Sequence, residues 1–204
     1  MITIINYGVG NVMAFRNVFT RLKVAHKIAT CDDDLTGASK LVLPGVGAFD
    51  WAMNRLTQSG MRNRLDELVL EREIPVLGVC VGFQMMARTS EEGHVRGLEW
   101  LDADVKRIQL EELKKEYVLP HMGWNDANVT TEHPLFDQLS DPRFYFLHSY
   151  YFSAFGTTKT LAETSYGTNF CCAAFFKNIF GVQFHPEKSH KWGEQLLKNF
   201  AELI

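Results

Sequence analysis

Apolar residues in the first half of the chain recur in short runs, each followed by a glycine turn. Residues 2–6 form a β-branched run, and residues 11–23 then carry apolar side chains at helical spacing. Two further runs, residues 41–43 and 75–79, lead in the same way through glycine-rich turns into helical segments. This alternation predicts a mostly parallel α/β sheet, with ligands gathered at the carboxyl ends of its strands.

The second half of the chain changes to shorter strand-like pieces. Lys177-Asn178 separates two of them by two residues and predicts a hairpin turn, so we expect antiparallel strands to extend the sheet. The closing segment, residues 192–203, has apolar residues at helical spacing and predicts a helix. The strands expected in this half are residues 104–108, 144–147, 160–163, 171–176 and 179–184.

Composition restricts the class of protein. With 204 residues, 46% of them apolar, we expect residues 1–204 to form one domain with a sizeable core. The formal net charge of −3 argues against a general nucleic-acid binder. The N-terminus lacks the features of a signal peptide and no run of about 18 apolar residues occurs, which predicts a cytosolic protein that does not bind to membranes. The four cysteines suggest neither a disulfide framework nor a zinc site.

One cysteine has the sequence context of a nucleophile. Cys80 lies in the segment Gly78-Val79-Cys80-Val81-Gly82, which follows an apolar strand and has the G-x-C-x-G form of a nucleophile elbow. Glycines two residues to either side remove Cβ atoms that would collide in so sharp a turn. Because helical propensity resumes at residue 83, we expect the sulfur at a helix N-terminus, where the dipole favours a thiolate. The alternative is a cysteine buried for packing, which the two glycines make less probable.

A nucleophilic thiol commonly needs a base, and His185 is the best candidate. It follows the apolar run 179–184 and precedes Pro186-Glu187. In an extended segment residues two apart share a face, so Glu187 is placed to orient the imidazole while His185 faces the sulfur. A structural His-Glu pair is the alternative. Solvated rings are expected for His26, His94, His133 and His190, whose surroundings are polar or turn-like.

These motifs together resemble the class I, or triad, glutamine amidotransferases. The resemblance extends over essentially the whole chain and implies the three-layer, flavodoxin-like fold of that family, a glutaminase activity on L-glutamine, and no cofactor or metal. Val81 and Phe83 stand where the family more often has Leu and Met. The matching pieces are residues 6–11, 43–49, 78–84, 120–125, 145–150 and 181–189.

The resemblance also implies roles for individual residues. Cys80, His185 and Glu187 would form the catalytic triad, and backbone N–H groups near Val81 and from the Val46-Gly47 loop would receive the oxyanion. The glutamine would be held by Gln84, Glu92, His148, Ser149 and Tyr150.

A partner is implied because ammonia released into solvent is lost. In the most similar family members, a HisF-type (β/α)8 cyclase subunit receives the ammonia and forms imidazole glycerol phosphate and an aminoimidazole carboxamide ribotide, and the two subunits form a heterodimer. Two alternatives stay open: an ammonia-supplying subunit for amidation of a bacterial surface sugar, and an inactive flavodoxin-like binding module. Positions matching the partner interface are Met122, Trp124, Asn125, Tyr145 and Lys188.

Overall fold

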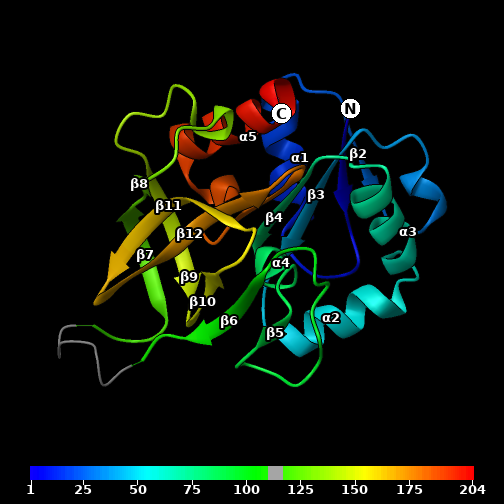
Figure 1. The fold of residues 1–204 in the computed structure, drawn as a ribbon. Coiled ribbons are helices and arrows are strands. Elements are labelled where there is room, and N and C mark those ends of the chain that lie inside the picture. The colour runs from blue at the N-terminus through cyan, green and yellow to red at the C-terminus, as the bar shows by residue number, and fades with distance from the viewer. Residues whose placement is uncertain (110–116) are drawn as a thin grey trace.

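The protein has an α/β fold built on one large mixed sheet, with a two-stranded sheet beside it (Figure 1). The computed structural model describes residues 1–109 and 117–204. In the large sheet the strands follow the order β2-β1-β3-β4-β13-β12-β10-β6-β5, while β11 pairs with β12 and β8 with β11. The predicted combination of a mostly parallel sheet with added antiparallel strands is confirmed.

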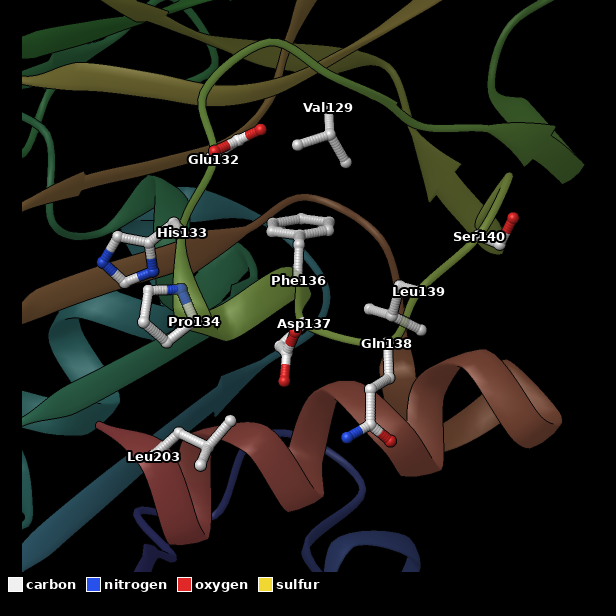
Figure 2. A pocket seen from close by; sticks show the side chains of 10 residues that line it. All are labelled: Val129, Glu132, His133, Pro134, Phe136, Asp137, Gln138, Leu139, Ser140 and Leu203. Atoms are coloured by element: carbon white, nitrogen blue, oxygen red, sulfur yellow. The ribbon is translucent and has the colours of Figure 1, made fainter.

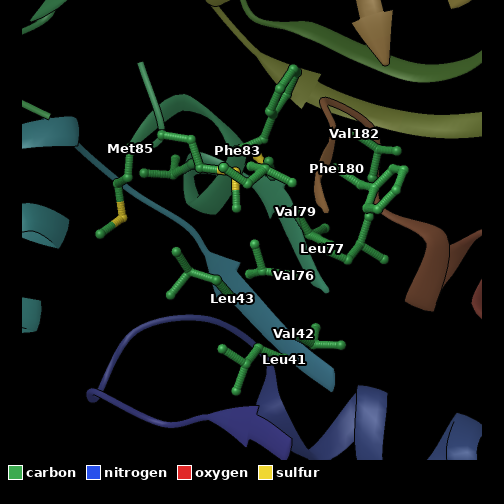
Figure 3. Packing of buried hydrophobic residues seen from close by; sticks show 14 of the residues in the cluster. Leu41, Val42, Leu43, Val76, Leu77, Val79, Phe83, Met85, Phe180 and Val182 are labelled. Carbon is green, nitrogen blue, oxygen red and sulfur yellow. The ribbon is translucent and has the colours of Figure 1, made fainter. Parts of the chain in front are cut away.

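The parallel half of the sheet forms the centre of the core. Every residue of three of its strands is buried, as expected for strands covered on both faces. Figure 3 shows Leu41, Leu43 and Val76 packed among the other apolar side chains of these strands. The parallel strands are β1 (Ile2–Ile5), β2 (His26–Ala29), β3 (Lys40–Gly45), β4 (Val76–Cys80) and β13 (Ile179–Val182).

The helices cover both faces because the direction of winding reverses within the sheet. From β1 the chain passes through α1 (Val12–Arg21) to β2, whereas from β3 it passes through α2 (Phe49–Gln58) and α3 (Arg62–Asp66) to β4 on the opposite side. Right-handed crossovers therefore place α1 on one face and α2 and α3 on the other. The closing helix α5 (His190–Leu203) packs beside α1 (Figure 1). Within the described part of the chain, no helix is both long and apolar enough to span a membrane.

Antiparallel strands extend the sheet in the second half of the chain. The predicted hairpin between β12 and β13 is present, and Lys177 occupies it with a φ of +52°. The two-stranded sheet pairs β7 (His121–Asp126) with β9 (Arg143–His148). The other strands are β5 (Thr89–Ser90), β6 (Ala103–Arg107), β8 (Asn128–Val129), β10 (Tyr150–Ala154), β11 (Lys159–Tyr166) and β12 (Thr168–Phe176). Short helical turns are Asp33–Leu35, Glu67–Glu71, Pro134–Phe136 and Pro186–Lys188.

Candidate active site

Cys80 stands on a sharp turn between β4 and the short helix α4 (Val81–Gln84). Its φ of +55° and ψ of −116° lie outside the conformations that a side-chain-bearing residue normally adopts. Such strain persists only where the surrounding structure imposes it, and it is typical of functional sites. The turn lifts the cysteine to the carboxyl end of the parallel sheet and leaves it at the N-terminus of α4.

Close backbone contacts make this turn possible and explain its glycines. A Cβ on Gly82 would lie 2.0 Å from the carbonyl oxygen of Leu43, and one on Gly45 would lie 2.3 Å from the backbone nitrogen of Gly82. The end of β3 thus packs directly against the first turn of α4. As a result, the exposed loop of Val46 and Gly47 lies beside Cys80.

His185 and Glu187 form a buried pair at the end of the following strand. Nδ1 of His185 lies 2.9 Å from Oε1 of Glu187, and the two side chains are only 3% and 2% exposed. The expectation of an extended segment here is wrong, because Pro186–Lys188 forms a 3-10 turn. The fixed φ of proline favours such a turn, and the turn itself brings the carboxylate back onto the imidazole.

The electrostatic surroundings favour the charged form of His185. Burial lowers the pKa of the imidazole, but hydrogen bonding to Cys80 and Glu187 outweighs burial, so the net pKa lies above its usual value of 6.5. A carboxylate on one side of the ring and a sulfur on the other can therefore stabilise an imidazolium between them. This arrangement suits a group that both accepts and donates a proton.

Ser189 locks the histidine onto β9. Its hydroxyl donates to the backbone carbonyl of His185 at 2.6 Å and accepts from the backbone N–H of Tyr145 at 2.9 Å. The backbone N–H of His185 in turn donates to the carbonyl of Tyr145 at 2.8 Å. Because Ser189 is fully buried, these bonds are shielded from water and hold the imidazole in one position.

A cavity of about 130 Å³ joins these groups. Water occupies about 30 Å³ per molecule in the liquid, so the space holds a small polar molecule rather than a nucleotide. Glu187 lies behind His185 and does not line the cavity. The lining residues are Val46, Gly47, Cys80, Val81, Gln84, Glu92, Leu147, His148, Ser149, Tyr150, His185 and Lys188.

Gln84 and Glu92 both make hydrogen bonds at this cavity. The amide nitrogen of Gln84 donates to the carbonyl of Tyr150 and to Oε1 of Gln183, each at 3.0 Å, which uses both amide protons and leaves the oxygen for a ligand. Oε2 of Glu92 accepts from the backbone N–H of Phe49 at 2.9 Å, at the start of α2. Burial raises the pKa of the Glu92 carboxyl, although this hydrogen bond opposes the shift.

The five residues expected at a partner interface lie on or beside the two-stranded sheet. Met122 is 65% exposed, and Trp124, 40% exposed, stacks on His190. Nζ of Lys188 lies 5.8 Å from the centre of the Tyr145 ring, at the edge of the cavity. Asn125 differs, because its amide is turned inward and donates to the carbonyl of Ser165 at 2.9 Å.

Cavity volume alone does not identify the site. A larger cavity of about 910 Å³ is lined by Phe136 and Leu203, between the loop before β9 and the end of α5 (Figure 2). It contains no cysteine, and the only histidine in its lining is His133. Across the described ranges, 1–109 and 117–204, no three histidine, cysteine or acidic side chains are grouped as a metal site requires.

Three buried polar residues were not predicted from the sequence to belong to the site. Gln183, His121 and Ser189 are 0%, 2% and 0% exposed. A glutamine inside the apolar run 179–184 was a usable signal, because a buried amide needs partners. The expectation of a solvated ring is wrong for His133, which is half-buried against Phe175.

Comparison with known proteins gives one consistent result. The model of the family described as "Glutamine amidotransferase class-I" matches residues 3–203. The chain is 48% identical over 204 residues to "Imidazole glycerol phosphate synthase subunit HisH" of Bdellovibrio bacteriovorus and 46% identical to the protein of the same name from Leptospira borgpetersenii, with all of both chains covered in each case. A solved glutamine amidotransferase structure, 19% identical, has a TM-score of 0.76 and covers 99% of this chain and 97% of its own.

Proposed function

The chain belongs to the class I glutamine amidotransferase family and is similar over its whole length to HisH subunits of imidazole glycerol phosphate synthase, and we propose that it hydrolyses L-glutamine through a Cys80-His185-Glu187 triad. The ammonia passes to a HisF-type (β/α)8 cyclase subunit. One observation carries the proposal: the strained cysteine and the buried histidine line the same small cavity, and Glu187 holds the far side of the imidazole at 2.9 Å.

The first half of the reaction forms a covalent intermediate. The Cys80 thiolate attacks the side-chain amide carbon of glutamine, and the developing oxyanion accepts hydrogen bonds from backbone N–H groups near Val81 and from the Val46-Gly47 loop. His185, as the imidazolium, protonates the departing nitrogen. The carbon–nitrogen bond breaks, ammonia leaves, and a glutamyl thioester remains on the sulfur.

The second half releases glutamate. Neutral His185 removes a proton from a water molecule, which attacks the thioester carbon, and the carbon–sulfur bond breaks to regenerate the thiolate. Glu187 keeps the proton on Nδ1 of His185 and stabilises each imidazolium that forms. Its nearly complete burial and the raised pKa of His185 support this role.

Gln84, Glu92 and the backbone of residues 148–150 bind the glutamine. The free oxygen of Gln84 accepts a hydrogen bond from the ligand, and the Glu92 carboxylate attracts its α-amino group. These groups lie in the cavity that also contains Cys80, which supports the assignment. The volume of about 130 Å³ suits one small amino acid.

The exposed face of the two-stranded sheet receives the cyclase subunit. Met122, Trp124 and Leu147 are 65%, 40% and 37% exposed, an apolar group of the kind that marks protein interfaces. Leu147 and Lys188 also line the cavity, so a partner bound on this face lies next to the site where ammonia is released.

Reconstitution tests the proposal. The chain is mixed with the HisF-type subunit of the same organism, and glutamine-dependent formation of imidazole glycerol phosphate is measured together with glutamate release. We expect weak glutaminase activity alone and a large increase with the partner and its ligand. Strong activity in isolation would contradict coupling, and activation only by an enzyme that amidates surface sugars would assign the other acceptor.

A Cys80→Ala variant separates an enzyme from a binding module. It removes the nucleophile but keeps the fold, so glutamate release should disappear while thermal unfolding is preserved. If glutamate release persists in this variant, Cys80 is not the nucleophile; if the parent protein releases none with either partner, the chain is a binding module.

A further inference from the structure

A line of hydrogen bonds runs inside the protein from strand β7 to the cysteine. On β7, the amide nitrogen of Asn125 lies 3.2 Å from Nε2 of His121. Nδ1 of His121 lies 3.0 Å from Nε2 of His148, and Nδ1 of His148 lies 2.9 Å from the carbonyl oxygen of Tyr150. The two histidines face each other across the strands, because His121 and His148 are paired in the register of β7 and β9.

The same Tyr150 carbonyl connects this line to the catalytic thiol. Its oxygen also accepts from Nε2 of Gln84 at 3.0 Å, and that nitrogen donates as well to Oε1 of Gln183. The amide nitrogen of Gln183 lies 3.9 Å from the sulfur of Cys80. The carbonyl of Tyr150 is thus the point where bonds from β7 and bonds from the cysteine meet.

The chemistry of the partners sets the direction of every bond. The carbonyl of Tyr150 can only accept, so Nδ1 of His148 carries a proton and its Nε2 accepts. Nδ1 of His121 must then donate, which leaves its Nε2 free to accept from the amide of Asn125. Each imidazole is therefore neutral and protonated at Nδ1 alone, and a positive charge on either ring would break one of the bonds.

The surroundings keep both rings in this state. His121 is 2% exposed and lies between the rings of Phe146 and Tyr166, at centroid distances of 4.8 and 4.1 Å. His148 is 6% exposed and meets Phe170 edge to face at 5.4 Å. Burial among aromatic rings lowers the pKa of His121 to about 4 and that of His148 to about 3, in agreement with neutral rings at physiological pH.

We propose that His121 is a positioning residue for glutamine. Its Nδ1–H orients His148, and His148 holds the Tyr150 carbonyl and the backbone of residues 148–150 where glutamine binds. The inference rests on the proposed glutaminase function and adds to it a residue outside the cavity lining. Since His121 touches neither the sulfur nor the ligand, its loss weakens glutamine binding more than it slows the chemical step.

Two substitutions distinguish the donor from the volume of the ring. His121→Asn puts an amide nitrogen close to the place of Nδ1 and can still donate to His148, whereas His121→Gln puts its amide near the place of Nε2. We expect His121→Gln and His121→Leu to raise the KM for glutamine by about tenfold with kcat changed less than about threefold, because a buried acceptor on His148 is left unpaired. His121→Asn should keep most of the parent affinity. Tyr166→Phe, which keeps the stacked ring, is the control and should leave KM unchanged.

Two further measurements test the inference without relying on catalysis. Calorimetric titration of glutamine into Cys80→Ala, with and without His121→Gln, gives the change in Kd without catalysis. Ring ¹⁵N chemical shifts of the parent protein report the tautomers, and both histidines should be protonated at Nδ1 alone.

Several results would overturn the inference. These are an unchanged KM in both His121→Gln and His121→Leu, an equal loss in His121→Asn, a fall in kcat at constant KM, or a proton on Nε2 of His148. Failure of the proposed function looks different, because the parent protein itself would then release no glutamate with either candidate partner. In that case the ring tautomers still show whether the bonds exist.

Discussion

Replacing Glu187 by Gln tests the part of the proposed triad that depends most on electrostatics. The change keeps the size of the side chain and removes its charge. Oε1 of Glu187 lies 2.9 Å from Nδ1 of His185, and Oε2 is buried without a hydrogen-bond partner among the described residues. The side-chain amide of the introduced glutamine can point either way, and both orientations are unfavourable.

With its oxygen toward His185, the introduced amide would keep a neutral hydrogen bond but bury an NH₂ group that has no acceptor. With its nitrogen toward His185, it would force Nδ1 to accept and put the ring proton on the nitrogen that faces Cys80. The first orientation loses a charge-assisted bond worth about 1.5–3 kcal/mol, or roughly 10- to 150-fold in rate. The second selects the wrong tautomer, which in a serine-protease triad costs about 10⁴-fold.

We therefore expect Glu187→Gln to lower kcat by about 10- to 10⁴-fold with the partner bound and glutamine saturating. Glutamate release is followed with a coupled dehydrogenase assay, and the rate of Cys80 alkylation by iodoacetamide reports the thiolate separately. Because Glu187 helps to raise the pKa of His185, alkylation should also slow at a given pH.

The matched control is Glu73→Gln, which removes the same charge from an exposed pair with Lys177 and should leave kcat within about twofold. A folded Glu187→Gln protein that keeps more than about a third of the parent kcat would refute the reasoning, since the carboxylate would then have no role in orienting or charging the imidazole.

Three other perturbations test the packing and the charge states. Gly82→Ala should lower the free energy of unfolding by about 3 kcal/mol, because its Cβ would lie 2.0 Å from the Leu43 carbonyl oxygen. Gly37→Ala, whose Cβ would have nothing within 4 Å, should cost only about 1 kcal/mol. Urea unfolding compares the two variants. Ser189→Ala should cost about 2 kcal/mol and reduce kcat, since the backbone of His185 loses its buried bond; equal stability in urea would contradict this. Acidification from pH 6.5 to about 4 should destabilise the parent protein, because His121 and His148 take up protons in the unfolded chain but stay neutral in the folded protein over this range. The free energy of unfolding should fall less steeply with pH in His121→Asn, which has one of these histidines fewer.

Local structure at the site was largely predictable from the sequence. Gly78 and Gly82 around Cys80 indicate the sharp turn because they concern contacts within a few residues of the cysteine. The apolar runs indicate the strands for a similar reason, since the alternation of strand and helix depends on side-chain spacing along a short segment. The one local error is the segment after His185, where the proline favours a turn rather than an extended strand.

The placement of polar groups between distant strands was not predictable. Nothing near His121 in the chain shows that it faces His148, since that pairing follows from the register of β7 and β9. Gln183 likewise gains its importance only when β13 lies next to β4 and brings its amide toward Cys80 and Gln84. These contacts depend on the whole sheet being assembled.

By itself, then, the sequence determined the alternation of strand and helix in the first half of the chain, several strands of the second half, the elbow at Cys80 and, through resemblance, the family. It also proposed the residues of the site. Only the tertiary structure decided the volume of the cavity, the direction of the pKa shift of His185, the hydrogen bonds of Ser189 and the contact between His121 and His148 behind Tyr150. The reason is physical: backbone conformation is governed largely by neighbours along the chain, whereas burial and hydrogen-bond partners, which set pKa values and ring tautomers, come from residues that meet only after folding.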